Sequence, residues 1–448
     1  MQKVFFSVSF WAKVFLVGMI FHFFLQTFIT FGVWLEFTIL RLWKEILILL
    51  LAFFLAYQFK LYLQDIVKDK IILFLELTFI TWVVLTFIIN FFVLWTSLSD
   101  YVMAFRYDFL WFVIFFLFYH LWNFLEDQQI ENILFFFWKT IKVLLVIAFF
   151  WYMLIMVKPW ALWPLGYDNK IFEWEVWKAP PAVYYTQQNQ GFPRNQVLFE
   201  RPINYWFFLV FFFPMFYVLF LRRRAVSKTW LWWVLYVFSI ISTFSRAAWW
   251  AWFFQLLVIL LLEYGRNIRK KLVYLVLPIL LVFSVFVYVG YDQVVQRQWS
   301  DTWHFQKVQE SWQMFTQAPV LWSQAGYVWP VSHRWDWIEF NPENQFLLIL
   351  VQYWIVWFIF WFVIYLFLCL IGFYYYFYKF DKKQRKDFWP WLLLAMSLGM
   401  VWLSIEWMVL HGFVDRMVVY PSMTIFGLVY FFVHKNYKSL QSKKNSKK

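Results

Sequence analysis

The chain has 448 residues, of which 64% are apolar, 27% are aromatic and only 14% are charged. A soluble globular protein is about half apolar and about a quarter charged, so this composition excludes an ordinary soluble protein. The formal net charge is +14, but the basic residues lie in short clusters between apolar stretches. This pattern is typical of the cytoplasmic loops of a membrane protein and does not indicate a nucleic-acid partner. The single cysteine, Cys369, excludes an intramolecular disulfide and a thiolate metal cluster.

Apolar stretches long enough to cross a bilayer recur along the whole chain. They are apolar on every face, which excludes the alternating pattern of a β-barrel and leaves the helix as the spanning unit. At ~20 residues a span, we predict an all-α polytopic membrane protein with about 12 transmembrane helices. The N-terminal stretch lacks the cleavage site of a signal sequence and is kept as the first span. The expected spans are 12–35, 45–59, 71–97, 108–124, 133–157, 204–221, 229–244, 247–263, 271–290, 346–374, 388–411 and 418–434.

The basic clusters predict the orientation of the chain. If the N-terminus is cytoplasmic, the loops after the even-numbered spans are cytoplasmic as well. These loops hold nearly all of the basic clusters, as expected from the enrichment of Lys and Arg on the cytoplasmic side. We therefore expect a multi-pass protein of the inner (plasma) membrane with both termini cytoplasmic. A single membrane domain over 1–434 precedes a basic tail, 435–448, predicted to be disordered. Two long loops, about 158–203 and 291–345, face outward. The cytoplasmic clusters are Lys60, Lys68 and Lys70; Arg222, Arg223, Arg224 and Lys228; Arg266, Arg269, Lys270 and Lys271; Lys379, Lys382, Lys383, Arg385 and Lys386; and the six tail lysines.

A short outward hairpin between two expected spans carries one charged residue. It reads Ser242-Thr243-Phe244-Ser245-Arg246. A lone arginine at a membrane edge often extends to the lipid headgroups. The functional alternative is a diphosphate ligand, because a guanidinium binds phosphate oxygens in pairs and keeps its charge.

Polar residues also stand where the second long loop enters a long span. Glu343 and Asn344 there favour a helix first turn through capping and the helix dipole. The alternative for Glu343 is a general base, which works best when burial brings its pKa toward the working pH. His304 and His333 lie in the same loop, but neither has metal-ligand spacing to a second histidine or cysteine.

The stretch Arg106-Tyr107-Asp108 opens the expected span 108–124 at the same outer face. A local ion pair between Arg106 and Asp108 is the simplest explanation of these charges. The chain has no phosphate-binding glycine loop, no His-x-x-x-His helix and no nucleophile elbow. Nothing in the sequence therefore indicates ATP, a metal or a covalent serine intermediate.

Three of these stretches, taken in order, resemble the O-antigen ligase and polymerase superfamily. They are Ser245-Arg246 in the outer hairpin, Ala318-Pro319-Val320-Leu321 in the large outer loop, and Glu343-Asn344-Gln345-Phe346-Leu347 at the next span. The family pattern is Ser-Arg-Gly, then Pro-Leu-Leu-Gly-x-Gly, then His/Glu-Asn-x-x-Leu before a span with a Gly-x-x-Gly step. The resemblance covers about 229–375. The ligases often have histidine where this chain has Glu343, which leaves ligase and polymerase both open.

The resemblance implies a GT-C-like membrane glycosyltransferase that needs no cofactor or metal. Its donor would be a glycan on a polyprenyl diphosphate such as undecaprenyl diphosphate, as in lipopolysaccharide and other cell-envelope polysaccharide biosynthesis. Its acceptor would be a glycan, lipid or protein at the outer membrane face. Preorganised cations stabilise the growing charge of a diphosphate leaving group. The implied roles are diphosphate binding for Arg246 and Arg297, acceptor activation for Glu343 with His304 as the alternative base, and substrate binding for Asn344 and Arg106.

Two other classes of protein remain open. A lipid-linked glycan flippase or transporter would also have about twelve spans, but it would place ionisable residues near the bilayer midplane. Most charges here lie in loops, with Glu36, Glu76 and Glu406 as the exceptions. A non-enzymatic membrane scaffold is the other alternative, and substitutions at Arg246 and Glu343 would then leave the glycans of the cell unchanged.

The counts of glycine and tryptophan are anomalous. The chain has 11 glycines and 34 tryptophans, whereas glycine averages ~7% of residues and is enriched in membrane helices. Tryptophan also stands where the family pattern has glycine, at Trp249 and Trp250 in the first motif, Trp322 in the second, and Trp354 and Trp357 in the last span. We hypothesise that UGA codons meaning glycine in the source organism, as some bacterial lineages read them, have been translated as tryptophan. Glycine would then reach about a tenth of the chain, which suits close helix packing.

Overall fold

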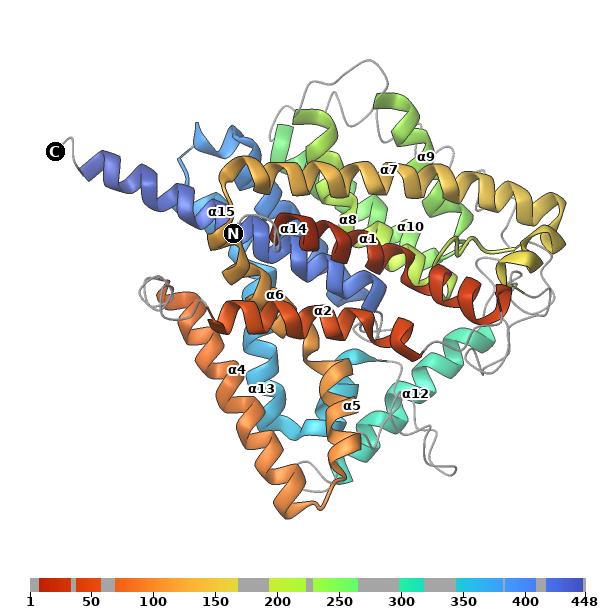
Figure 1. Cartoon of the computed structure of the whole chain (residues 1–448), viewed down its shortest axis with the longest axis horizontal. Helices are drawn as coiled ribbons and strands as arrows, with labels where there is room; N and C mark the ends of the chain where they lie inside the picture. The colour runs from red at the N-terminus through yellow and green to blue at the C-terminus, as the bar shows by residue number, and fades with distance from the viewer. Residues whose placement is uncertain are drawn as a thin grey trace. The chain divides into compact units, whose positions relative to one another are not determined.

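The structure is a computed structural model that describes residues 8–33, 38–57, 69–167, 193–222, 229–264, 298–317, 344–381, 383–407 and 416–445. Every regular element among these residues is a helix (Figure 1). The fold class is therefore all-α, as the composition predicts. In chain order the α-helices are α1 (Val8–Thr27), α2 (Thr38–Tyr57), α4 (Lys70–Ile88), α5 (Leu98–Asp108), α6 (Leu110–Leu121), α7 (Asp127–Val157), α8 (Pro202–Arg222), α9 (Thr229–Ser242), α10 (Arg246–Tyr264), α12 (Gln298–Gln317), α13 (Gln345–Tyr374), α14 (Phe388–Trp407) and α15 (Arg416–Asn445).

Several of these helices are long and apolar enough to cross a membrane. Among the described residues there are seven, or eight if the bent pair α5 and α6 forms one span. About twelve spans are expected from the sequence. Of these, 271–290 lies outside the described residues, and the helices α9 and α10 are apolar but shorter than a full span. The described helices are thus those expected of a multi-pass membrane protein, and the number of about twelve spans stays a prediction, because part of the chain lies outside the described residues.

The chain divides into two compact units, each assembled from separate stretches of sequence. Unit 1 comprises Met1–Ala12, Lys44–Asn132 and Thr302–Lys448, and unit 2 comprises Lys13–Trp43 and Ile133–Asp301. The sequence predicts one membrane domain and gives no sign of this division. Hydropathy locates spans along the chain, but it does not report which spans pack together.

Unit 1 is built around α13, which packs on α14 and α4, while α15 packs on α6 and α14. Two glycines lie where these helices approach most closely. A Cβ atom on Gly372 would stand 2.5 Å from the Leu393 carbonyl oxygen of α14, and one on Gly427 would stand 2.8 Å from the Phe115 carbonyl oxygen of α6. Small residues at such points allow the backbones of membrane helices to meet. The Ser397 hydroxyl strengthens the first contact, since it accepts from the Gly372 N–H at 2.9 Å and donates to the Leu368 carbonyl at 2.8 Å.

Unit 2 is centred on α8, which packs on α9 and α10. Every residue from Tyr205 to Phe216 is buried, including Pro214 inside the helix. Polar side chains of the neighbouring helices bond to the α8 backbone, because Gln255 of α10 donates to the Val210 carbonyl at 3.0 Å and Tyr236 of α9 donates to that of Leu209. These bonds fix the two helices that carry the outer hairpin.

The C-terminal region differs from expectation. We predict disorder after residue 434, but α15 continues as a helix to Asn445. Lysine, which is frequent in this stretch, is a good helix former, so the helix can propagate from its apolar part. Lys435 also donates to Asp127 in unit 1 at 2.8 Å.

Candidate functional site

The hairpin of unit 2, which the sequence predicts to face outward, is a tight turn that starts a helix. After α9 ends at Ser242, Phe244 adopts a left-handed backbone with φ of 48°. Ser245 then caps α10, since its hydroxyl accepts from the Ala248 N–H at 3.4 Å. A serine at this position satisfies one of the free N–H groups of a helix start. Arg246 is the first residue of α10, so it stands at the positive end of the helix dipole, where anions bind.

The end of the first long loop, just before α8, holds this hairpin in place. The Arg194 guanidinium donates from Nε to the Thr243 carbonyl at 2.7 Å. The Asn195 backbone N–H donates to the Ser242 carbonyl at 2.8 Å, and its side-chain amide donates to the Ser242 hydroxyl at 3.0 Å and to the Ala148 carbonyl of α7 at 3.1 Å. Asn195 is fully buried and Arg194 nearly so. The segment therefore fixes the backbone ahead of Arg246 and brings a second guanidinium to the hairpin.

Removing the Asn195 side chain is expected to loosen the hairpin. In Asn195→Ala the Ala148 carbonyl and the Val197 N–H, which donates to the Asn195 side chain at 3.1 Å, lose buried partners. Each buried group left without a partner costs ~1–3 kcal/mol, so we expect the free energy of unfolding to fall by about 2–4 kcal/mol. Denaturant unfolding in detergent micelles measures it. The exposed Asn123 gives the matched variant Asn123→Ala, which should change stability by less than ~0.5 kcal/mol; equal effects would contradict the clamp.

The structure describes only some of the residues that are expected to bind or activate the acceptor. Glu343 and Arg297 lie outside the described residues, as do His333 and the motif that begins at Ala318. Asn344 is the N-cap of α13, and its side chain accepts from the Leu347 N–H at 2.9 Å. The capping alternative for Asn344 is thus confirmed.

His304 and Arg106 both belong to unit 1, whereas Arg246 belongs to unit 2. His304 lies in α12, which occupies part of the second outward loop. Arg106 lies near the end of α5 and binds Glu45 of α2, with Nε at 2.7 Å and Nη2 at 2.5 Å from the same carboxylate oxygen.

The predicted ion pair between Arg106 and Asp108 is wrong. Asp108 instead accepts a hydrogen bond from the Tyr353 hydroxyl of α13 at 2.8 Å. These residues also end α5 and precede a 60° bend, so they do not open a span. Residues two apart in a helix point to different sides, so each of the two charges has its partner on another helix.

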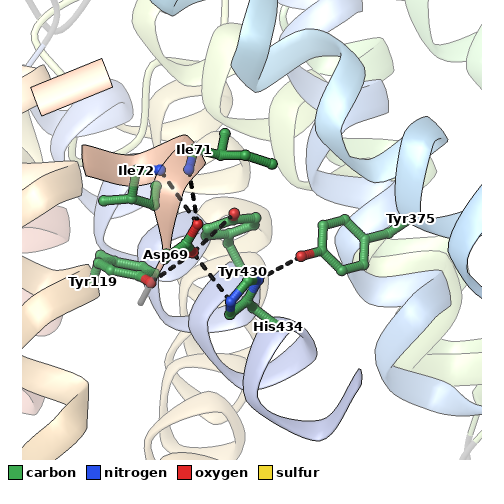
Figure 2. A network of polar contacts seen from close by, with 7 residues as sticks. All are labelled: Asp69, Ile71, Ile72, Tyr119, Tyr375, Tyr430 and His434. Atoms are coloured by element: carbon green, nitrogen blue, oxygen red, sulfur yellow. Dashed lines mark hydrogen bonds and ion pairs between the residues drawn. The ribbon is translucent and has the colours of Figure 1, made fainter. Parts of the chain in front are cut away.

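A second polar cluster, absent from the sequence prediction, lies at the start of α4 (Figure 2). Asp69 caps this helix, since its Oδ1 accepts from the N–H groups of Ile71 and Ile72 at 3.2 and 3.3 Å. Its Oδ2 accepts from the hydroxyls of Tyr119 and Tyr430, at 2.8 and 3.3 Å. The buried carboxylate therefore joins α4 to α6 and α15.

The cluster continues through a histidine. Nε2 of His434 lies 3.4 Å from Oδ2 of Asp69, and Nδ1 of His434 lies 2.5 Å from the Tyr375 hydroxyl. Asp69 stands between the basic residues Lys68 and Lys70 of a predicted cytoplasmic loop, so the sequence alone presents it as one more loop charge. Among the described residues no group of three His, Cys, Asp or Glu could hold a metal, and we interpret the Asp69 cluster as a structural connection.

The Asp69 cluster should be worth several kcal/mol of stability. Asp69→Ala removes a helix cap and the acceptor of buried hydroxyls, and breaking a buried charged pair typically costs ~3–5 kcal/mol. The matched control is Asp127→Ala. Asp127 pairs with Lys435 at 2.8 Å, the same distance as between Asp69 and the Tyr119 hydroxyl, but the side chains of Asp127 and Lys435 are about half exposed. Exposed pairs contribute ~0–1 kcal/mol. Thermal unfolding of both variants in detergent compares them, and a small effect at Asp69 would contradict the structural interpretation.

Comparison with known proteins assigns neither a family nor a function to this chain. No protein-family model, curated protein or solved structure matches the chain. The function proposed below therefore rests on the residues of the hairpin and on the motif resemblance.

Arg194 and Asn195 are the site residues that sequence reasoning missed. They follow Pro193 at the end of the first outward loop, in the polar run Arg194-Asn195-Gln196 just before an apolar stretch. A polar run that is buried at a membrane edge needs hydrogen-bond partners. That requirement is the signal which could have drawn attention to it.

Proposed function

We propose that this protein transfers a glycan from a polyprenyl diphosphate donor to an acceptor at the outer face of the inner membrane. The observation that supports it most is the hairpin of unit 2, where Arg246 starts a helix capped by Ser245 and where Arg194 is held beside the turn at 2.7 Å from the Thr243 carbonyl. The diphosphate leaving group gains negative charge as the glycosidic bond breaks. Cations and helix N–H groups that are already in place stabilise that charge without reorganisation.

The other roles follow the motif resemblance. Glu343 is proposed to orient or deprotonate the acceptor hydroxyl, with His304 as the alternative base, and Arg297 is proposed as a second diphosphate ligand. Asn344 caps the first turn of α13, and Glu343 is the residue before it in the sequence. Arg106 is the weakest of the proposed substrate ligands, because Glu45 already binds its guanidinium. A GT-C-like arrangement of about twelve spans is part of the same proposal.

The surroundings of several tryptophans support the hypothesis that glycine belongs at many of the tryptophan positions of this chain. Trp95 follows the helical segment that ends α4 and has a left-handed φ of 55°, a conformation that a bulky residue rarely adopts and that glycine commonly supplies after a helix. The Trp82 ring centroid lies 3.8 Å from that of Phe109, and Trp111 lies 3.5 Å from Phe112. Aromatic pairs normally stand ~4.5–7 Å apart. Glycine would remove this crowding.

One tryptophan of α10, close after the first motif, also lacks a hydrogen bond for its indole N–H in the described part of the chain. Trp252 on α10 is buried, and its indole N–H has no hydrogen-bond partner among the described residues. A buried indole N–H normally finds an acceptor. Glycine at this position would leave no such group and would let α10 approach its neighbour closely.

Reconstitution of the full chain tests the proposed activity. The purified protein is placed in lipid vesicles with a synthetic polyprenyl diphosphate glycan and an acceptor fraction from the outer face of the source cells. We expect glycosidic transfer with release of one polyprenyl diphosphate for each bond formed, without added metal. Absence of transfer by a chain that carries glycine at the motif positions would contradict the proposal.

The flippase or transporter alternative is favoured by ionisable residues inside apolar helices. Glu76 of α4 pairs with His120 of α6, and the buried Asp108 lies at the bend between α5 and α6. Ionisable residues inside membrane helices commonly mark transport pathways. In the same vesicles, movement of the intact lipid-linked glycan between leaflets without transfer would support this alternative.

A further inference from the structure

Asp108 lies near the middle of a bent pair of apolar helices. It is the last of the 11 residues of α5 and is followed, after one residue, by the 12 residues of α6. The two helices are bent by 60° and together are long and apolar enough to cross a membrane. At ~1.5 Å per residue Asp108 stands roughly 15 Å from the first residue of the pair, which is about half of a ~30 Å hydrocarbon core. A re-entrant pair would also place the bend at its deepest point.

The carboxyl group of Asp108 is buried with a single hydrogen bond. The residue is 1% exposed, its Oδ2 accepts from Tyr353, and its Oδ1 has no hydrogen-bond partner among the described residues. The side chain therefore does not cap α6, although it stands next to the N-terminus of that helix. The Phe109 ring packs on that of Tyr353, the donor to Asp108, with ring centroids 4.9 Å apart.

The charged and titratable groups around Asp108 leave it without a counterion. Arg106 on the same helix is bound to Glu45 of α2 at 2.5 Å. Tyr353 of α13 and Tyr101 of α5 are neutral hydroxyls, and Tyr420 of α15 donates to the Arg106 carbonyl at 3.5 Å. In the part of the chain that the structure describes, no cation pairs with Asp108. An isolated carboxylate inside a membrane is unfavourable unless it is paired or neutralised, and a proton neutralises it.

We propose that Asp108, with Tyr353, is a proton-binding site inside the membrane-spanning part of unit 1. The carboxyl oxygen takes up one proton from water and releases it again, so the charge of the site changes by one and no other reactant is needed. The site belongs to unit 1 alone and does not depend on the glycan transfer proposed for the hairpin of unit 2. Its two polar side chains are not tryptophans, but tryptophans border it: the Trp111 indole donates to the Asp108 carbonyl at 2.7 Å, and the Trp82 ring centroid lies 5.7 Å from that of Tyr353.

Polar groups flank this site along α4 in both directions. Toward the end of α4, the Thr86 hydroxyl contacts the Tyr101 hydroxyl at 3.0 Å. Toward its start, Glu76 pairs with His120, which follows Tyr119 of the Asp69 cluster in the sequence. Chains of acids, histidines and hydroxyls of this kind carry protons in pumps and transporters.

Carbodiimide labelling of the full chain in membranes tests the site. Dicyclohexylcarbodiimide is lipid-soluble and reacts with protonated carboxyl groups. The carboxyl oxygen bonds to the central carbon, the proton moves to a nitrogen, and the O-acylisourea so formed rearranges to a stable N-acylurea. An aspartate with the ordinary pKa of ~3.9 is almost wholly ionised at neutral pH. The control is Asp100, which is partly exposed at the start of the same helix. We expect peptide mass spectrometry to show Asp108 labelled at least about tenfold more than Asp100.

The pH dependence of the labelling distinguishes a carboxyl group that holds a proton from one that is only accessible to the reagent. Labelling of Asp108 should fall as the pH rises. Tyr353→Phe removes the hydrogen bond donated to Oδ2, which favours the ionised form, so labelling in this variant should persist to higher pH. The proposal is overturned if Asp108 of the unaltered chain is no more labelled than Asp100, or if Tyr353→Phe leaves the pH profile unchanged.

Discussion

Replacing Arg246 with alanine should abolish glycan transfer while leaving expression and membrane insertion intact. Arg246 starts α10 at the capped hairpin, where the diphosphate is proposed to bind. Loss of one preorganised donor to a developing anion typically costs ~10²–10³ in rate, and a guanidinium supplies two donors and a full charge. We therefore expect transfer by Arg246→Ala to fall at least about 100-fold, as measured by polyprenyl diphosphate release in vesicles.

Two further variants make this test specific. Arg246→Lys keeps the charge but loses the paired donors, so it should retain part of the activity. Arg201→Ala removes an arginine of the same unit that lies just before α8, 3.9 Å from Glu200, and should transfer normally. Full activity of Arg246→Ala would remove the central assignment of the hairpin.

The identity of the tryptophans should have a comparably large effect. We expect a chain with glycine at Trp249, Trp250, Trp322, Trp354 and Trp357 to be active, and the chain with tryptophan at all of them to be inactive. Trp249 is buried behind the hairpin, and its indole donates to the Ile240 carbonyl at 3.2 Å. Large side chains at a point of close helix approach force the backbones apart, which would displace Arg246.

Two measurements check this prediction. The first reads the codons of the gene at these five positions, where UGA together with a glycine-specific tRNA is expected. The second compares transfer by the two chains, each made from a synthetic gene. UGG codons, or equal activity of the two chains, would show that the tryptophans are genuine and would leave the chain as a polytopic membrane protein without its glycine motifs.

Much of the fold can be read from the sequence because hydropathy reports burial in lipid directly. The helices α7, α8, α14 and α15 overlap the spans expected at 133–157, 204–221, 388–411 and 418–434. The bend between α5 and α6 could not be read in the same way. Hydropathy gives a continuous apolar stretch after Asp108, and the partner of that residue, Tyr353, is far away along the chain.

The candidate site is predictable in part for a similar reason. Ser245 and Asn344 are typical helix caps, and both cap a helix in the structure. Arg106 could not be placed, because its partner Glu45 lies on another helix and the nearer Asp108 is the wrong choice. Asn195 could not be assigned either, since its contacts with Ser242 and Ala148 arise only when a loop returns to the hairpin. Local rules predict local contacts, and tertiary contacts need the fold.

The most direct test of a transferase is the leaflet in which its donor accumulates when the gene is deleted. Lipid-linked glycan is extracted from the deletion strain after its exposure to an impermeant reagent that modifies sugars on the outer leaflet alone. If the protein transfers the glycan, the donor should collect on the outer leaflet, loaded and untransferred, and the unaltered gene should clear it. Collection of the donor on the inner leaflet would contradict a transferase and indicate a flippase.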